Sequence, residues 1–277
     1  MAIRTYYWSD RILGKTCHRA LRAFRLRPSY FFSTGNAGDI FARDLIRHVY
    51  KQDAVNVNDS GNRLLCIGSI GHRIKAGDVL CGVGCKDIEL SSVDPKSITI
   101  YGLRGPRSLE KFRSAGFDVS NVKFLMDPGL MIRFMLEPES VPVVKGRIAF
   151  IPHYRERYEA ARRIAGKFHF IDIDADPITV GKEILSSEVV LSSSLHGIIF
   201  AHALGRPAVL VRPGTPEPLS KFEDYYLSVD LPFTPPLDSV DDFSALIHDH
   251  SPPTLHFARE DFYFPPLAEL KDRGIAI

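Results

Sequence analysis

The segment VVLSSSLHGIIFAHALGRP, residues 189–207, carries the clearest structural pattern in this sequence. Its first residues are β-branched and apolar, as in a strand that is buried on both faces. An apolar helical run follows and ends at Gly205 and Pro207, which are typical of a helix C-terminus. Serines and His196 lie at the junction. The segment predicts a buried strand leading into a helix whose first turn carries a histidine.

The same alternation of strand and helix patterns extends over most of the chain. Strands are predicted at 29–33, 63–68, 78–84, 97–102 and 122–127, and again at 147–152, 168–173, 188–193 and 207–211. Helical patterns between them favour parallel sheets covered by helices. Pro138, Pro142 and Gly146 interrupt the alternation, as is typical of a linker. We therefore expect an α/β fold with two Rossmann-like lobes facing a central cleft, at 1–140 and 141–250, and a tail at 251–277 that can cross back to the first lobe.

The composition excludes several classes of protein. The chain has 277 residues, of which 45% are hydrophobic and 25% charged, so it can bury a large core. A formal net charge of +2 gives no reason to expect nucleic-acid binding. No segment has the roughly 20 apolar residues that span a bilayer, and the start lacks the apolar core of a signal peptide. We expect a cytoplasmic protein with reduced cysteines.

The residues before Pro28 carry a local excess of basic side chains. From Arg11 to Phe24, apolar residues recur at helical spacing and the basic residues fall largely elsewhere on the helix, which predicts a basic amphipathic helix. Such a helix can lie on an anionic membrane surface or contact a lipid-linked substrate. The alternative is a first helix that packs on the domain with a solvated basic face.

Ligands of open α/β sheets bind beyond the carboxyl ends of the strands. One loop of this kind is STGNAGDIF, residues 33–41, where the glycines allow close backbone approach and Asp39 occupies an expected helix N-cap. The loop is not a dinucleotide fingerprint or a Walker loop, so nucleotide binding does not follow. A tight turn with a capping aspartate is the alternative.

Three further loops offer groups for an anionic ligand. In YGLRGPRSLEKF, residues 101–112, Arg104 precedes a helix N-terminus, and its guanidinium matches carboxylate or phosphate oxygens. His196 lies in the first turn of its predicted helix, where anions bind. In RPGTPEPLSKFEDYY, residues 212–226, Lys221 could hold a second negative group of the same ligand. Each side chain has a plain alternative: a solvated arginine, a structural histidine and a surface lysine.

Taken in order, NAGD, YGLRGPRSLE, MDPGL, IPHY, SSSLHGIIFAHALGRP and SKFEDYY resemble the polysaccharide pyruvyl transferase family. The resemblance runs from Asn36 to Tyr226, and the tail matches no motif of it. It implies two Rossmann-like lobes of the GT-B type and transfer of pyruvate from phosphoenolpyruvate to two hydroxyls of a sugar, forming a ketal. The acceptor would be an oligosaccharide or a lipid-linked precursor.

The resemblance also assigns roles to residues. His196 would be the general acid, protonating either the methylene carbon or the departing phosphate, and Asp39 the base for a sugar hydroxyl. The phosphoenolpyruvate site would comprise Arg104, Ser194, Leu195, Lys221 and Asn36, and the acceptor or pocket residues would be His153 and Arg212. This path needs no metal or cofactor, and no cluster in the sequence has convincing ligand spacing.

Two other functions fit the same fold pattern, because fold does not determine function. One is a glycosyltransferase that uses a nucleotide-sugar donor, and the other is a noncatalytic carbohydrate-binding protein. Arg104 and His196 suit a small trianionic donor better than a sugar nucleotide.

Overall fold

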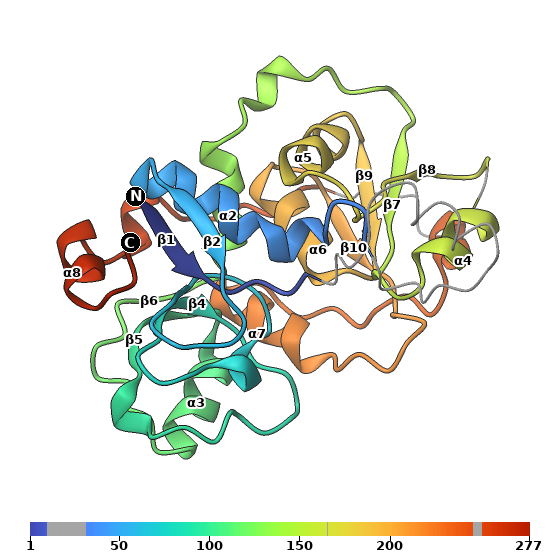
Figure 1. Ribbon diagram of the computed structural model, residues 1–277. Helices are drawn as coiled ribbons and strands as arrows, with labels where there is room; N and C mark the ends of the chain where they lie inside the picture. Colours follow the sequence, from blue (N-terminus) through green and yellow to red (C-terminus); the bar gives the residue numbers. More distant parts are fainter. Residues whose placement is uncertain (10–31, 165, 246–250) are drawn as a thin grey trace.

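The computed structural model describes residues 1–9, 32–164, 166–245 and 251–277, which form two parallel sheets with helices between and around them (Figure 1). The six-stranded sheet has the order β2-β1-β3-β4-β5-β6 and contains β1 (Ala2–Thr5), β2 (Asp53–Asn56), β3 (Leu64–Leu65), β4 (Val79–Val83), β5 (Thr99–Leu103) and β6 (Phe124–Leu125). The four-stranded sheet has the order β10-β9-β7-β8 and contains β7 (Ile148–Ile151), β8 (His169–Phe170), β9 (Val189–Ser192) and β10 (Ala208–Leu210). The prediction of an α/β protein with parallel sheets is confirmed.

Most of the described helices connect successive strands, and the loops of interest lie at helix N-termini. The connecting helices are α2 (Ala37–Tyr50), α3 (Pro106–Ser114), α4 (Arg157–Arg163), α5 (Pro177–Leu185) and α6 (Leu195–Ala203), whereas α7 (Ser220–Ser228) and α8 (Leu267–Asp272) follow the last strand. No helix in the described ranges is both long and apolar enough to cross a membrane.

The start of the chain differs from the prediction. The strand of the first βα unit is β1, which the sequence analysis missed together with β2. Of the strand predicted at 29–33, residues 29–31 lie outside the described part of the chain, and Phe32 and Ser33 are not in a strand. The predicted basic helix from Arg11 to Phe24 also lies outside it. Both missed strands are four residues long, and β2 is largely exposed, so neither has a marked apolar run.

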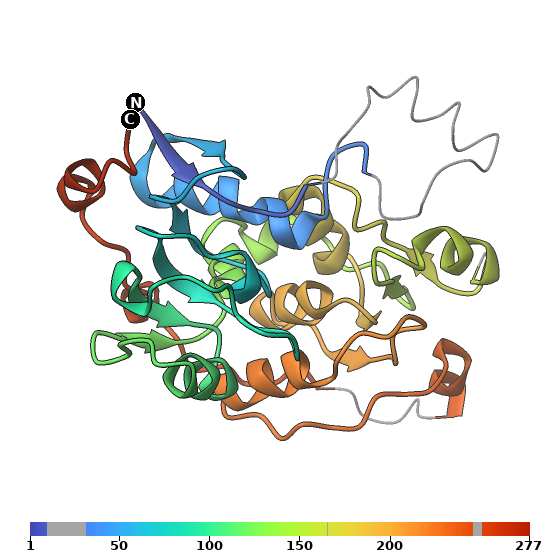
Figure 2. The ribbon, with the colours of Figure 1, turned by 60° about the horizontal axis from the view of Figure 1, so that its bottom comes forward.

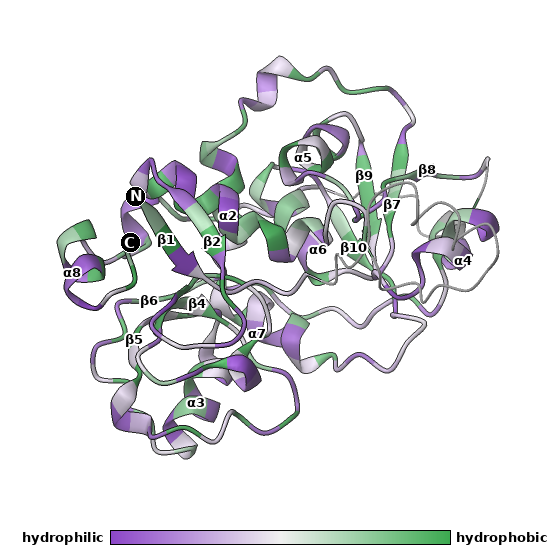
Figure 3. Cartoon of the chain, in the orientation of Figure 1, coloured by the Kyte–Doolittle hydropathy of each residue, from purple (hydrophilic) through white to green (hydrophobic). Residues whose placement is uncertain are grey.

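One hydrophobic core extends from the first sheet to the second. It contains Ile3 and Leu64 on one side and Ala149 and Val190 on the other. Helices α2 and α6 lie between the sheets (Figure 1). Every residue of α6 is buried, as expected for a helix that is apolar on all faces (Figure 3). This central position places the first turn of α6 where the two sheets meet.

The last residues of the chain pair with β1. Ala2 N–H donates to the Ile277 carbonyl at 2.6 Å, and Arg4 N–H donates to the Ile275 carbonyl at 2.8 Å. Because β3 pairs with β1 only at Thr5, the first half of β1 is open on that side. The tail occupies this place, and the two termini lie side by side (Figure 2).

Candidate functional site

A cavity of about 310 Å³ lies where the carboxyl ends of strands from both sheets meet. Its lining comes from the segments that follow β1, β3, β4, β7, β9 and β10. The lining residues are Tyr6, Trp8, Asn36, Asp39, Ser69, Ile70, His72, Arg73, Lys86, Ile88, His153, Tyr154, Arg155, Ser194, Leu195, His196, Glu217 and Lys221. The structure thus brings most of the sequence-predicted site residues together in one cavity.

The N-terminus of α2 is fixed to the second sheet. The Asp174 carboxylate accepts hydrogen bonds from the backbone N–H groups of Ser33, Thr34 and Gly35 at 2.8 to 3.1 Å. The loop after β8 therefore holds the loop that leads into α2. Asn36, and not Asp39, is the N-cap of this helix, because helical geometry already begins one residue after Asn36.

Asp39 projects from the first turn of α2 into the cavity. Its Oδ2 accepts a hydrogen bond from Asn36 Nδ2 at 2.6 Å. Burial raises the pKa of Asp39 to about 6, although Asn36 and the lysines at 86 and 221 act in the opposite direction. This carboxyl can therefore exchange a proton near neutral pH.

The side chain of His196, in the first turn of α6, lies between the start of α2 and the segment that follows β6. It packs directly on Gly38, where a Cβ atom would lie only 2.0 Å from His196 Nδ1. Its Nε2 is buried without a hydrogen-bond partner and lies 4.0 Å from Asp127 Oδ2, which is also buried and unpartnered. Buried polar atoms in native proteins are nearly always hydrogen-bonded. Two unpaired atoms facing each other in one site therefore suggest proton transfer or ligand binding.

The protonation of this pair follows from its burial. Burial, with help from Arg104 and Lys221, lowers the pKa of His196 to about 3. Burial raises the pKa of Asp127 to about 6, partly opposed by Arg104 and the N–H of Gly129. Without ligand, His196 is neutral at pH 7. The carboxyls of Asp127 and Asp39, each with a pKa of about 6, are the groups of the site that can give or take a proton near neutral pH.

Positive groups gather around Glu217 at this end of the cavity. Lys221 Nζ lies 2.8 Å from the Glu217 carboxylate, Arg155 lies 3.4 Å from it and Lys86 lies 3.6 Å from it. Burial raises the pKa of Glu217, but Lys221, His153 and Lys86 outweigh this effect and lower it to about 2. The cations exceed the carboxylate that they share, so this end of the cavity is suited to an additional anion.

His153 connects this cluster to the rest of the cavity. Burial lowers its pKa to about 3, so it is neutral at pH 7. Its Nε2 lies 3.6 Å from Glu217 and its ring lies against that of Tyr154, with 4.3 Å between the centroids. His153 thus lies between the charged groups and an aromatic part of the same cavity.

Arg104 lies behind the cavity and not in its lining. Its Nε donates to Asp224 Oδ2 at 3.0 Å, its Nη1 to Ser69 Oγ at 2.6 Å and its Nη2 to the Cys85 carbonyl at 2.9 Å. Asp224 is in turn bound by the first N–H groups of α3, at 107 and 108. In this structure Arg104 acts on the cavity through Ser69 and through its charge.

Arg212 is not part of the cavity. Its guanidinium, half exposed, donates to Asp238 at 2.8 Å. The reason is the path of the chain after β10, where Val211 forms a bridge to Leu237 and directs the following residue toward that segment. No observation links Arg212 to the other predicted site residues.

Two carboxylates of the site, Asp127 and Glu217, were not among the residues predicted from the sequence. Asp127 is the last residue of the strand pattern 122–127, so the rule that ligands bind at strand ends could have found it. Glu217 lies in a proline-rich loop and has no comparable signal. Among the described residues, no group of three or more His, Cys, Asp or Glu side chains is arranged to hold a metal ion.

Comparison with known proteins identifies relatives of this chain. A family model described as polysaccharide pyruvyl transferase matches residues 89–214. An uncharacterized protein of Acanthamoeba polyphaga mimivirus is 30% identical over 210 residues, which cover 71% of each chain. No solved structure matches. The family match contains Asp127 and His196, whereas Asp39, Glu217 and Lys221 lie outside it.

Proposed function

The chain belongs to the polysaccharide pyruvyl transferase family, and we propose that it transfers the pyruvyl group of phosphoenolpyruvate to two hydroxyls of a sugar, forming a ketal and releasing phosphate. The observation that carries this proposal is the composition of one end of the cavity. There, an excess of cations lies beside a buried His–Asp pair and a second carboxyl of raised pKa.

Binding of phosphoenolpyruvate would use the cations and the first turn of α6. Lys221, Lys86 and Arg155 replace part of the water that hydrates the phosphate and carboxylate. Residues 194–196 present the N-terminus of α6 to the cavity, and helix N-termini favour anions. Arg104 contributes its charge from behind Ser69.

The proton for the methylene carbon would come from the pair formed by His196 and Asp127. A bound phosphate raises the pKa of His196, since an opposite charge favours the protonated imidazole. Asp127, with a pKa of about 6, can supply or share the proton at Nε2. Proton addition at C3 leaves a cationic centre at C2.

The sugar then reacts twice at C2. The first hydroxyl adds there and loses its proton to Asp39, which is the base in this proposal. The second hydroxyl displaces phosphate as the bond between C2 and the phosphate oxygen breaks. The proton that Asp39 takes from the first hydroxyl replaces the one that the enzyme gave to C3. The proton of the second hydroxyl leaves with the phosphate.

The fold proposal is that each sheet is the centre of one Rossmann-like lobe in a GT-B-like arrangement, with lobes at 1–140 and 141–250. The cavity is at the small end of the range of roughly 300 to 1,000 Å³ for ligand sites, which suits a small donor better than a nucleotide sugar. A cytoplasmic location and membrane contact through residues 11–24 belong to the same proposal.

The test is incubation of the purified protein with phosphoenolpyruvate and a panel of methyl glycosides and disaccharides of common hexoses. Release of phosphate together with the mass gain of a pyruvyl ketal supports the proposal. We expect His196→Asn to lower turnover at least ~100-fold, the scale for loss of a proton donor. His169→Asn is the matched control, because His169 pairs with Glu183 away from the cavity. Sugar transfer from a nucleotide sugar, or saccharide binding without any reaction, would overturn the proposal.

A further inference from the structure

Part of the cavity is lined by aromatic rings, and one of them, Tyr154, lies under the Arg155 guanidinium, 5.4 Å from its ring centroid. Tyr6, Trp8 and Tyr154 line this part, and Phe32 packs behind Trp8. The Trp8 and Tyr154 rings are 4.9 Å apart between centroids, at an angle of 45°, and Phe32 meets Trp8 edge to face at 5.3 Å. We call the three lining rings the aromatic wall. We propose that the aromatic wall is the acceptor subsite, against which one sugar ring stacks; this inference rests on the proposed pyruvyl transfer.

The backbone after β1 directs these rings into the cavity. Tyr6 and Trp8 are two residues apart and line the cavity, whereas Tyr7 between them does not. Tyr7 is held in an extended backbone by paired hydrogen bonds with the Asn56 side chain, at 3.1 and 3.0 Å. Alternate residues of extended backbone point to opposite sides, so the two rings share one face.

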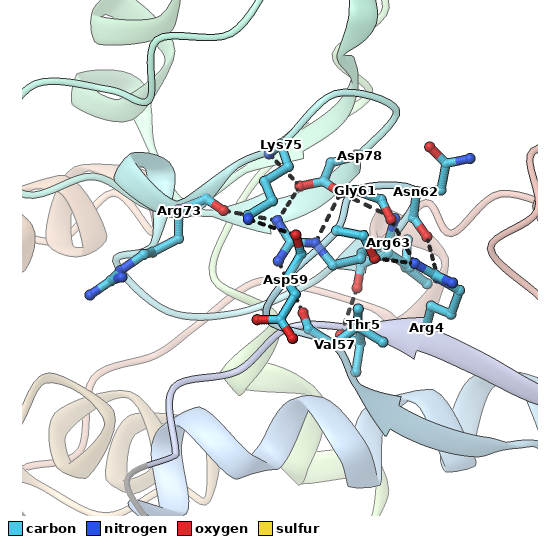
Figure 4. Close-up of polar contacts among 12 residues, drawn as sticks. Arg4, Thr5, Val57, Asp59, Gly61, Asn62, Arg63, Arg73, Lys75 and Asp78 are labelled. Carbon is cyan, nitrogen blue, oxygen red and sulfur yellow. Dashed lines mark hydrogen bonds and ion pairs between the residues drawn. The ribbon is translucent and has the colours of Figure 1, made fainter.

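A buried ion pair lies next to one ring of the wall, Tyr6. The pair is formed by Arg63 and Asp78, which are fully buried, with 2.6 Å between Arg63 Nη2 and Asp78 Oδ2 (Figure 4). The Arg63 guanidinium lies over the Tyr6 ring, 5.3 Å from its centroid, and also donates to the Arg73 carbonyl at 2.8 Å. A buried pair is costly unless its hydrogen bonds are satisfied, and here Arg63 also donates to the Val57 carbonyl. The ring of Tyr6 is therefore held in place before ligand binds.

The chemistry of this wall matches a sugar ring. A pyranose has a face of C–H groups that packs on an aromatic ring and a rim of hydroxyls that need hydrogen-bond partners. Polar groups border the aromatic faces: the Tyr154 hydroxyl, bonded to Arg155 Nε at 3.0 Å, and the side chain of Arg73. The hydroxyls of a saccharide can form hydrogen bonds with both groups, whereas an entirely apolar ligand can form none.

The position of the wall also suits the acceptor. Tyr154 is adjacent to His153, whose other side faces Glu217 and the cations. A sugar stacked on Tyr154 and Trp8 would lie directly beside the donor, with its hydroxyl rim toward the reacting carbon. This proximity is what the two additions at C2 require.

The chain has a single tryptophan, so Trp8 reports on its own site. Titration of the wild-type protein with each methyl glycoside and disaccharide, monitored by tryptophan emission, should give a saturable change for those that are pyruvylated. We expect Trp8→Ala and Tyr154→Ala to raise the KM for that saccharide by roughly 3- to 10-fold, the scale of one lost stacking contact, with the KM for phosphoenolpyruvate unchanged. Tyr7→Ala is the matched control and should leave both constants unchanged.

The outcomes separate this inference from the proposed function. Suppose that a saccharide is pyruvylated but does not change the Trp8 emission of the wild type, and that both variants keep the wild-type KM for it. The subsite is then wrong and the function stands. If saccharides change Trp8 emission but no pyruvyl transfer occurs, the subsite stands and the function is wrong. If the variants instead raise the KM for phosphoenolpyruvate alone, or if no saccharide reacts or changes the emission, the acceptor subsite is refuted.

Discussion

Asp127→Asn tests the electrostatics of the site most directly, because the substitution keeps the shape and removes a buried charge. The side chain is 0% exposed, and its Oδ1 accepts a hydrogen bond from Gly129 N–H at 2.8 Å, which an asparagine oxygen can also accept. Burial raises the pKa of Asp127 from 3.8 to about 6 in the folded protein. A tenfold change in an acid constant corresponds to about 1.4 kcal/mol, so ionised Asp127 costs about 3 kcal/mol of folding free energy.

The sign of the effect follows from this raised pKa. Below pH 3.8 the carboxyl is protonated in both the folded and unfolded states, and the charge costs nothing. As pH rises toward about 6, the unfolded state loses its proton first, and the wild type loses stability until the folded carboxyl ionises as well. The variant has no carboxyl to ionise, so its stability relative to wild type should increase from about 2 kcal/mol at pH 5 to about 3 kcal/mol at pH 8.

Urea denaturation of wild type and variant at pH 5 and pH 8, monitored by Trp8 emission, measures this difference. Asp272→Asn, which removes an exposed carboxylate of the same type, is the control and should show little change. In the same variant, turnover should fall, because His196 loses its proton partner. A stability difference that does not depend on pH, or a variant less stable than wild type at pH 8, would refute the assigned protonation of Asp127.

Three further substitutions test other parts of the site. Gly38→Ala places a Cβ 2.0 Å from the present His196 Nδ1, so we expect turnover to fall at least ~10-fold in protein that remains folded; wild-type turnover would contradict the contact. Lys221→Met should raise the KM for phosphoenolpyruvate roughly 10- to 150-fold through loss of a charge-assisted contact, and an unchanged KM would place the donor elsewhere. Asp224→Asn leaves Arg104 buried without its carboxylate, so urea unfolding should show a loss of about 3 to 5 kcal/mol; a loss below ~1 kcal/mol would mean that the pair contributes little.

Sequence patterns predicted the strands from residue 63 onward because their segments are rich in apolar residues, all of which in the strands are at least partly buried. The predictions failed at β1 and β2, whose sequences AIRT and DAVN each contain only two apolar residues. So few apolar residues establish neither an apolar run nor a period. The start of the chain therefore shows a clear charge pattern but no clear strand pattern.

The strand-end rule also predicted which residues would meet. The structure brings five predicted residues to one cavity, each at the start of a helix or directly before it: Asn36, Asp39, Ser194, His196 and Lys221. The rule works because the carboxyl ends of parallel strands share one edge of a sheet. It does not predict which side chains face the cavity. Arg104 and Arg212 were predicted to line the site, but neither does: Arg104 lies behind the cavity and Arg212 pairs with Asp238.

The sequence by itself therefore determined the class of fold, the histidine at the start of α6 and the loops from which a site could be built, because these depend on local periodicity and turn residues. The tertiary structure alone decided the partners: His196 opposite Asp127, Lys221 beside Glu217, and Arg104 bound to Asp224. Their pKa values and roles depend on burial and on distances across the packed sheets. These quantities arise only when segments far apart in the chain are brought together.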